Sequence, residues 1–270
     1  DVVVARNLET LGIAVRGRAL STHTPPIAYE VLDIHRLLLR EDVIGKALRM
    51  LEGWLAKRAA IIITSSPAFI REYFEKRTSI KLPFLLLENK VFCTGPITIP
   101  APRPAAPPWR IGWFGAIRCR KSLNILSEVA KAHKGLVEII IRGRPAYDQF
   151  DDFDAQVNAA GIHFGGAYTP DDLAKIYGDI HFSWAIDMFE EGQNSAWLLP
   201  NRMYEGGLYG AVPITAKGVE TSRFAYALGI GHSLSEPKGE CLTQFLKNLT
   251  PETYAGMAHA VAQLMPKGAQ

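Results

Sequence analysis

The sequence predicts an α/β protein with two Rossmann-like, parallel-sheet domains that face each other across a cleft. Short apolar runs rich in β-branched residues alternate with longer segments of helical period along the chain, which is the pattern of parallel α/β domains. Six prolines between 96 and 108 interrupt this alternation, and neither a helix nor a sheet interior accommodates them. With 270 residues, each half is long enough to bury its own core.

The proline-rich stretch sets the expected domain boundaries. We expect an amino-terminal domain over 1–95, a stiff linker over 96–108 and a carboxyl-terminal domain over 109–270. In the first domain, strands alternate with helices, beginning with a strand, over 1–5, 8–20, 26–34, 40–59, 60–66, 67–77 and 82–89. In the second domain the same alternation covers 110–117, 121–133, 136–143, 153–161, 162–168, 169–178, 179–186, 198–210 and 211–216, and two further helices close the chain.

Composition favours a globular protein in a reducing compartment. Apolar residues make up 48% of the chain and charged residues 21%. No apolar run reaches the roughly 18 residues of a membrane span, and the first residues lack the pattern of a signal peptide. Cys93, Cys119 and Cys241 are widely spaced, which predicts neither a disulfide framework nor a zinc site. We therefore expect a cytoplasmic protein.

Charge is distributed unevenly along the chain. The net charge of +3 is too small to indicate a nucleic-acid partner. Residues 1–108 hold 15 Lys/Arg and 10 Asp/Glu, a net +5, whereas residues 109–270 hold 15 and 17, a net −2. The amino-terminal half is therefore the basic one.

A basic turn follows the first strand of the second half. Gly115 lies near the end of that strand, and Arg118, Arg120 and Lys121 directly precede or open a helix. A helix N-terminus offers free N–H groups and about half a positive charge. Cations at this point favour an anion site, and a solvated basic turn is the alternative.

The stretch "LLPNRMYEGGLYGAVPIT" (198–215) places two opposite charges in an apolar segment. Pro200 suits the first turn of a helix and Asn201 suits its cap. Arg202 and Glu205 are three residues apart, so they share one helical face. A surface Arg–Glu pair is one interpretation. In the other, Glu205 accepts hydrogen bonds from a ribose diol while Arg202 and the helix N-terminus face phosphates. Glycines follow at 206 and 207 and suit a close approach.

These motifs follow one another in the order of a known family. The segments are "IGWFGAI" with Arg118 and Lys121, "VEIIIRGRP", "IHFGGAYTPDDLAKIYGDIHFSWA" and "LPNRMYEGGLYGAVPIT". Residues 109–225 resemble the carboxyl-terminal domain of GT-B glycosyltransferases, in the large retaining family that uses nucleotide sugars. Residues 1–95 resemble the later part of that family's amino-terminal domain. The resemblance covers most of the chain, and its motifs are more specific for the donor half than for the acceptor half.

The resemblance implies transfer of a sugar, with retention, from a nucleotide-sugar donor to an acceptor hydroxyl in polysaccharide or glycolipid synthesis. Arg118 and Lys121 would stabilise the departing diphosphate, so no metal or other cofactor is expected. The implied donor-binding residues are Glu205, Arg202, Asn201, Asn194, Ser195, Gly115 and Gly165. His163 and Gly166 are further candidates beside the base, and Arg142 and Arg144 are candidates for phosphate, with structural or solvated roles as the alternatives.

The sequence departs from the family pattern in three places. The family often carries Glu-x7-Glu, but Trp197 stands eight residues before Glu205, so Glu190 or Glu191 is a candidate for the missing acid. Asp33 and His35 are the candidates for the histidine common at a strand end, and we expect His35 to be catalytic. The usual first strands of the amino-terminal domain are not recognisable before residue 1, so we expect this domain to be incomplete.

Other functions stay open at this stage. A nucleotide-sugar-binding or scaffolding relative without activity would fit the missing front strands, and a nucleotide-sugar epimerase would need an acid pair that the sequence does not show. The expected partners are the nucleotide sugar and a carbohydrate or lipid-linked acceptor. Trp54 lies among Lys46, Arg49, Lys57 and Arg58, and a peripheral contact of this basic domain with the inner face of a membrane would suit a lipid-linked acceptor. Core packing of Trp54 is the favoured interpretation.

Overall fold

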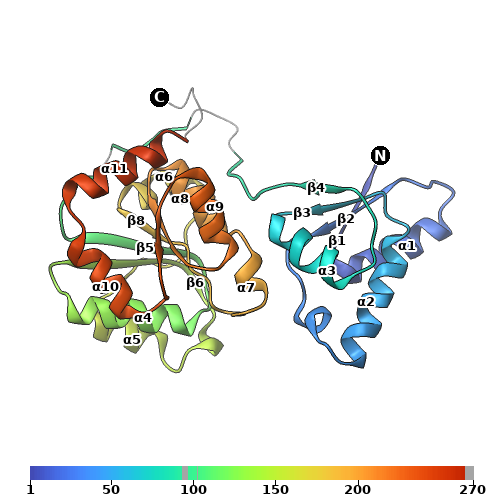
Figure 1. Cartoon of the computed structure of the whole chain (residues 1–270), viewed down its shortest axis with the longest axis horizontal. Helices are drawn as coiled ribbons and strands as arrows, with labels where there is room; N and C mark the ends of the chain where they lie inside the picture. The colour runs from blue at the N-terminus through green and yellow to red at the C-terminus, as the bar shows by residue number, and fades with distance from the viewer. Residues whose placement is uncertain (93–96, 102, 265–270) are drawn as a thin grey trace. The chain divides into compact units, whose positions relative to one another are not determined.

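The computed structural model describes residues 1–92, 97–101 and 103–264 (Figure 1). The chain divides into two compact units: unit 1 comprises 1–89 and 190–199, and unit 2 comprises 90–189 and 200–270. Each unit contains one sheet, and every strand pair in both sheets is parallel. The predicted α/β class with two parallel-sheet domains is confirmed.

Unit 1 has a four-stranded sheet in the order β1-β2-β3-β4. Its elements are β1 (Val3–Arg6), α1 (Asn7–Leu20), β2 (Ile27–Val31), η1 (Arg36–Leu39), α2 (Val43–Ala56), β3 (Ile61–Thr64), η2 (Phe69–Phe74), α3 (Glu75–Arg77), β4 (Phe84–Leu86) and α7 (Asn194–Trp197). Consecutive strands are neighbours in the sheet, and right-handed connections place the intervening helices on one face. Accordingly α1 and α2 pack side by side (Figure 1).

Two features of unit 1 differ from the predicted pattern. The helix expected over 67–77 begins as a π-helix, η2, and only its last turn is an α-helix, α3. Residues 190–199 belong to unit 1 although they lie between two segments of unit 2. Trp197 and Leu198 pack against the core of unit 1, and Ser66 donates a hydrogen bond from its hydroxyl to the carbonyl oxygen of Trp197.

Unit 2 has a six-stranded sheet in the order β10-β9-β8-β5-β6-β7. Its elements are β5 (Trp109–Ile117), α4 (Arg120–Ala132), β6 (Val137–Pro145), η3 (Tyr147–Gln149), α5 (Phe153–Ala160), β7 (His163–Phe164), η4 (Pro170–Asp172), α6 (Leu173–Gly178), β8 (Phe182–Trp184), α8 (Asn201–Leu208), β9 (Val212–Ala216), α9 (Glu220–Leu228), β10 (His232–Leu234), α10 (Gly239–Asn248) and α11 (Pro251–Ala262). Three helices and a strand therefore follow β9, where two helices were predicted.

Helices cover both faces of this sheet. Helices α4, α5 and α10 lie along one face, and α6, α8, α9 and α11 along the other (Figure 1). The central strands β5, β8 and β9 are almost wholly buried, which explains their continuous apolar sequences. The expected linker, 96–108, forms no helix or strand in its described residues, 97–101 and 103–108. Pro96, Pro102 and Cys93 lie outside the described residues.

Candidate active site

The strand order of unit 2 reverses between β5 and β8. From β5 the chain proceeds to β6 and β7 on one side, and from β8 it proceeds to β9 and β10 on the other. Ligands of open parallel sheets bind outside the carboxyl ends of the strands at such a reversal. Arg118 directly follows β5, and the loop 185–189 directly follows β8. These two segments therefore mark the candidate site.

Arg118 is the basic residue that the fold places at this point. Its side chain is exposed, and its guanidinium carbon lies 4.6 Å from the ring centroid of Phe189. Arg120 instead donates from Nη1 to Asp151 at 2.8 Å and from Nε to the carbonyl oxygen of Gln149 at 3.1 Å. The charge of Arg120 is thus partly compensated. Lys121 is exposed in the first turn of α4.

Arg202 fastens α8 to the same loop. Its side chain is only 9% exposed, donates from Nη2 to the carbonyl oxygen of Ile186 at 3.1 Å, and lies 3.7 Å from a carboxylate oxygen of Asp187. Its Nε is buried and has no hydrogen-bond partner among the described residues. Contacts of the 185–189 loop with Arg118 and Arg202 bring the end of β5 and the start of α8 to one place.

Glu205 has a partner of its own. Tyr177, on α6, is fully buried and donates its hydroxyl to Glu205 Oε2 at 2.8 Å. The carboxylate is half-buried, and within the described residues Oε1 accepts no hydrogen bond. Burial raises the pKa of Glu205, while Tyr177 and Arg202 oppose that change. Burial, followed by the Glu205 charge, also raises the pKa of Tyr168 to about 12.

The opposite charges in the 198–215 segment therefore serve different neighbours rather than a surface pair. The helix start also differs from the prediction: Pro200 is the cap residue, and Asn201 is the exposed first residue of α8 and makes no capping hydrogen bond. A Cβ on Gly206 would lie 3.1 Å from the Cβ of Ser183. The glycine thus allows α8 to pack closely on β8, whereas Gly207 has open space.

Glycines at the ends of β5 and β6 bring these two strands close together. Gly115 and Gly143 are paired across the strands, and Gly143 has φ +139°. A Cβ on Gly143 would lie 1.9 Å from the carbonyl oxygen of Gly115. Gly115 itself has φ +111°, a backbone conformation that favours glycine, so this predicted donor-binding residue has a structural function, and a ligand contact remains a prediction.

Arg142 packs against the turn that follows β7. A Cβ on Gly165 would lie 2.5 Å from the Arg142 side chain, and Arg142 donates to the carbonyl oxygens of Gly166 and Ala167 at 3.3 Å. The arginine holds this turn in place, whereas the expected alternative to phosphate binding was a solvated basic turn. His163 and Arg144 are exposed.

The remaining candidates lie in unit 1. Asn194 is buried, accepts from the Ile34 N–H at 3.1 Å and donates to Asp33 at 3.4 Å. Ser195 accepts from the Glu190 N–H at 2.8 Å. His35 is exposed and caps η1 by accepting from the Leu37 N–H at 3.3 Å. Each of these side chains serves unit 1 locally.

Sequence reasoning missed three residues of the site: Tyr177, Asp187 and Phe189. Tyr177 lies 28 positions from Glu205, so no local spacing pointed to the pair. Asp187 and Phe189 were recognisable only as part of the loop after a strand. The signal that could have found them is their position directly after β8, at the predicted reversal of strand order.

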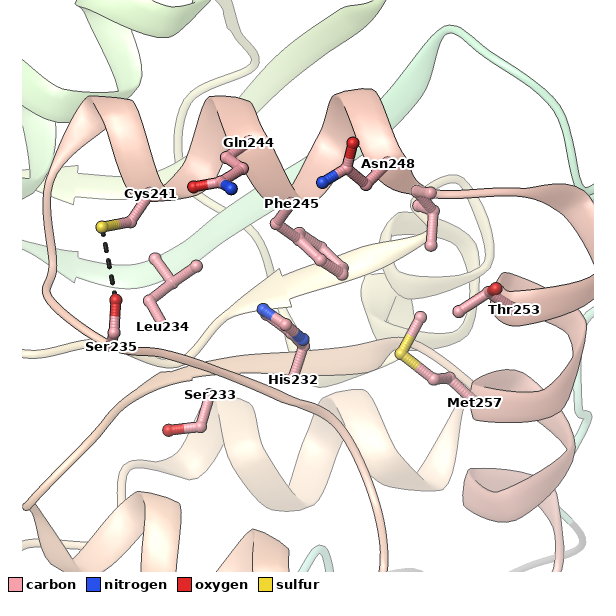
Figure 2. Close-up of a pocket in the computed structure, with 11 residues that line it drawn as sticks. His232, Ser233, Leu234, Ser235, Cys241, Gln244, Phe245, Asn248, Thr253 and Met257 are labelled. Carbon is pink, nitrogen blue, oxygen red and sulfur yellow. Dashed lines mark hydrogen bonds between the residues drawn. The ribbon is translucent and has the colours of Figure 1, made fainter.

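A cavity of about 410 Å³ lies elsewhere in unit 2, between the edge strand β10 and the helices α10 and α11. Figure 2 shows the His232 and Phe245 rings stacked inside it, and their centroids are 3.8 Å apart. Because β9 and β8 separate β10 from β5, this cavity does not belong to the site at the strand reversal.

In the described part of the chain, no helix is both long and apolar enough to cross a membrane. Residues 1–92, 97–101 and 103–264 likewise contain no group of three or more His, Cys, Asp or Glu side chains arranged to hold a metal ion. Cys119 and Cys241 are both free thiols.

Comparison with known proteins relates the whole chain to polysaccharide synthesis. The chain is 50% identical over 277 residues to the succinoglycan biosynthesis protein ExoL of Rhizobium meliloti (strain 1021), a match that covers 98% of this chain and 68% of the relative. No family model matches the chain.

Solved glycosyltransferase structures share the fold. Anabaena Alr3699/HepE in complex with UDP gives a TM-score of 0.71 at 14% identity, over 97% of this chain and 74% of that one. Sucrose-phosphate synthase from Thermosynechococcus elongatus gives 0.68 at 11% identity, over 98% and 69%. The lipopolysaccharide outer core galactosyltransferase WaaB gives 0.60 at 15% identity, over 100% and 72%.

Proposed function

We propose a function from one premise: this chain belongs to the family of the succinoglycan biosynthesis protein ExoL and is a GT-B glycosyltransferase by its fold. In this proposal it transfers a hexose, with retention, from a nucleotide sugar to a carbohydrate or lipid-linked acceptor during polysaccharide assembly. Relatives support the donor class, since HepE binds UDP and UDP-glucose. They also support the pathway class, since ExoL takes part in succinoglycan synthesis.

Glu205 is the observation that carries the donor site in this proposal. Its carboxylate is oriented by Tyr177 through one oxygen and offers the other to a ligand. A ribose diol can donate two hydrogen bonds to such a group, and hydrogen bonds to a charged acceptor are about twice as strong as neutral ones. Asn201 is exposed one turn earlier on α8 and can extend the same polar surface.

The diphosphate is proposed to lie against Arg118, Lys121 and the N-terminus of α4. The leaving group gains negative charge as the glycosidic bond to the donor breaks, and cations already in place stabilise that charge without reorganisation. Arg118 is fixed over Phe189, which limits its motion. Arg202 acts mainly by holding the 185–189 loop, since its guanidinium is already bound there.

Retention is part of the proposal and needs no protein nucleophile, because a leaving phosphate oxygen can accept the proton of the acceptor hydroxyl. The proposed roles of His35 in catalysis, and of Asn194 and Ser195 in donor binding, have less support, because each side chain already has a partner in unit 1. The free thiols of Cys119 and Cys241 fit a cytoplasmic location for the reaction.

The decisive experiment is transfer from radiolabelled uridine, guanosine, adenosine and thymidine diphosphate sugars to carbohydrate acceptors. Arg118→Ala is expected to lower kcat by about 10²–10³. Arg120→Ala is the matched control, because its charge is engaged with Asp151, and it should change kcat less than about threefold. Donor binding without turnover would instead identify a non-catalytic relative, and an inverted anomeric configuration in the product, measured by NMR, would exclude retention.

A further inference from the structure

The cavity between β10, α10 and α11 has no part in the proposed transfer reaction. Its volume of about 410 Å³ is within the roughly 300–1,000 Å³ that is usual for small-molecule sites. It lies at the edge of the six-stranded sheet, and neither Arg118 nor Glu205 lines it. A ligand held there would therefore not compete with a nucleotide sugar for the proposed donor site.

The walls of this cavity carry no charge in the part of the chain that the structure describes. The 11 lining residues include no Asp, Glu, Lys or Arg, although these types make up 21% of the chain. Burial lowers the pKa of His232 below its usual value, so its imidazole is neutral at pH 7 and has one donor and one acceptor nitrogen. Glu236 and Lys238, which are close to the cavity in the sequence, form an ion pair with each other. The cavity therefore favours a neutral ligand.

Neutral hydrogen-bonding groups line the cavity from two sides (Figure 2). Gln244 and Asn248 are exposed four residues apart on α10, so their amides lie on one side of that helix. Ser233 adds an exposed hydroxyl from β10. Among the described strands β10 pairs with β9 alone, so part of its backbone N–H and C=O groups turn away from the sheet. Amides and hydroxyls both donate and accept, and the cavity can therefore pair with a ligand that does the same.

An aromatic pair forms the apolar centre of the cavity. The rings of His232 and Phe245 are stacked, with centroids 3.8 Å apart and 13° between their planes (Figure 2). Phe245 also meets Phe182 of β8 edge-on at 5.5 Å, which anchors the pair to the sheet. Both rings of the pair are half-buried, so part of each is accessible. The face of an aromatic ring is negative, and it attracts the weakly positive C–H groups on one side of a sugar ring.

We propose that this cavity binds a neutral carbohydrate and is a site separate from the donor site. Sugar hydroxyls would pair with Gln244, Asn248 and Ser233, and sugar C–H groups would lie against the aromatic pair. A purely apolar ligand would leave the amides and hydroxyls without partners, which is unfavourable, and an anionic ligand would meet no cation. Under the proposed function, the growing polysaccharide supplies such a ligand. The cavity would then hold one part of the polymer while its end reacts elsewhere.

Saturation-transfer difference NMR on the whole chain tests the proposal without a nucleotide sugar, so its outcome does not depend on transferase activity. The probes are cellotetraose and β-1,4-galactotetraose, with tetragalacturonic acid as their charged counterpart. We expect saturation of a neutral tetrasaccharide and none of the acid. Excess UDP should leave the signal unchanged, and Glu205→Gln should give the signal of the parent, because Glu205 does not line the cavity.

Variants of the exposed amides give the magnitude. Each of Gln244→Ala and Asn248→Ala removes one polar partner and should raise the Kd of the tetrasaccharide about fivefold. The double variant should weaken binding more than either single change. Asn158→Ala is the matched control, because Asn158 is an exposed amide on α5 that does not line the cavity, and it should leave the Kd unchanged. Alanine is well tolerated in a helix, and thermal unfolding of each variant establishes that the fold is intact.

The proposal fails if neither neutral tetrasaccharide is saturated, or if tetragalacturonic acid binds as tightly as they do. It also fails if the double variant keeps the Kd of the parent, because the sugar would then lie on another surface of the chain. Loss of the signal on addition of UDP would place the sugar in the donor site and would equally overturn the proposal.

Discussion

Replacing Glu205 by glutamine should separate ligand binding from folding at the candidate site. Glutamine keeps an oxygen that can accept the Tyr177 hydroxyl, which Glu205 accepts at 2.8 Å. It removes the negative charge and replaces the other carboxylate oxygen, an acceptor, by an NH2 donor. Glu205→Ala removes the acceptor as well and leaves the buried Tyr177 hydroxyl unsatisfied, at a cost of about 1–3 kcal/mol.

The binding loss follows from the two hydrogen bonds that a ribose diol would donate. In the glutamine variant each of these bonds is weakened or lost, at a cost of at least about 1 kcal/mol, so donor binding loses at least about 2 kcal/mol, or roughly 30-fold in Kd. The fold should be almost unaffected. For the alanine variant, 1–3 kcal/mol corresponds to a decrease in Tm of about 2–12 °C in a domain of this size.

Isothermal titration calorimetry with nucleoside diphosphate sugars measures the first effect, and thermal unfolding without ligand measures the second. Tyr177→Phe serves as the control, because it leaves the carboxylate charged but no longer oriented by the tyrosine. Burial raises the pKa of Glu205, so donor affinity of the parent should decline as the pH falls toward that raised value. The glutamine variant should lack this decline. An unchanged Kd in Glu205→Gln would refute the assignment of Glu205 to the donor.

Two further predictions concern stability. Gly143→Ala should lower the unfolding free energy by about 3 kcal/mol or more, since its Cβ would meet the Gly115 carbonyl oxygen and φ is +139°. The control Gly161→Ala, with φ +65° and open space, should lower it by only about 1–2 kcal/mol. Equal urea midpoints for the two variants would contradict this difference. Burial raises the folded-state pKa of Glu52, so unfolded chains release this proton at lower pH and stability should fall as pH rises above about 4.3 toward the raised value. Urea denaturation from pH 4 to 8 should show that the unfolding free energy falls less steeply with pH in Glu52→Gln than in the parent. Parallel pH profiles of the two proteins would exclude this role of Glu52.

Much of the fold was predictable because the parallel strands are buried on both sides. β5, β8 and β9 appear in the sequence as short, continuous apolar runs between helical segments. The helix that contains Arg202 and Glu205 was also predicted, and its role in donor binding stays a prediction. Periodicity places residues on a face, but it does not identify the group that each face meets, so the separate partners Tyr177 and Asp187 emerged only from the fold.

The orientation of amphipathic α2 was misjudged for a related reason. Its apolar residues occur on both sides of the helix, and sequence alone does not tell which side meets the sheet. Trp54 was assigned to the core because large aromatic residues are usually buried, yet the sheet side is filled by smaller residues around Glu52. The return of 190–199 to unit 1 depends on tertiary hydrogen bonds of Asn194 and on packing of Trp197, and no local pattern encodes it.

That return has a consequence for biosynthesis of the chain. Unit 1 receives Asn194, Trp197 and Leu198 only after the ribosome has made the first four strands of unit 2. A nascent chain that stops at the proline-rich stretch would therefore have an unpaired Ile34 amide and an uncovered apolar surface. Unit 1 is therefore complete only when residues 190–199 have been made, and a domain exchange at the proline-rich stretch alone would remove that segment from it.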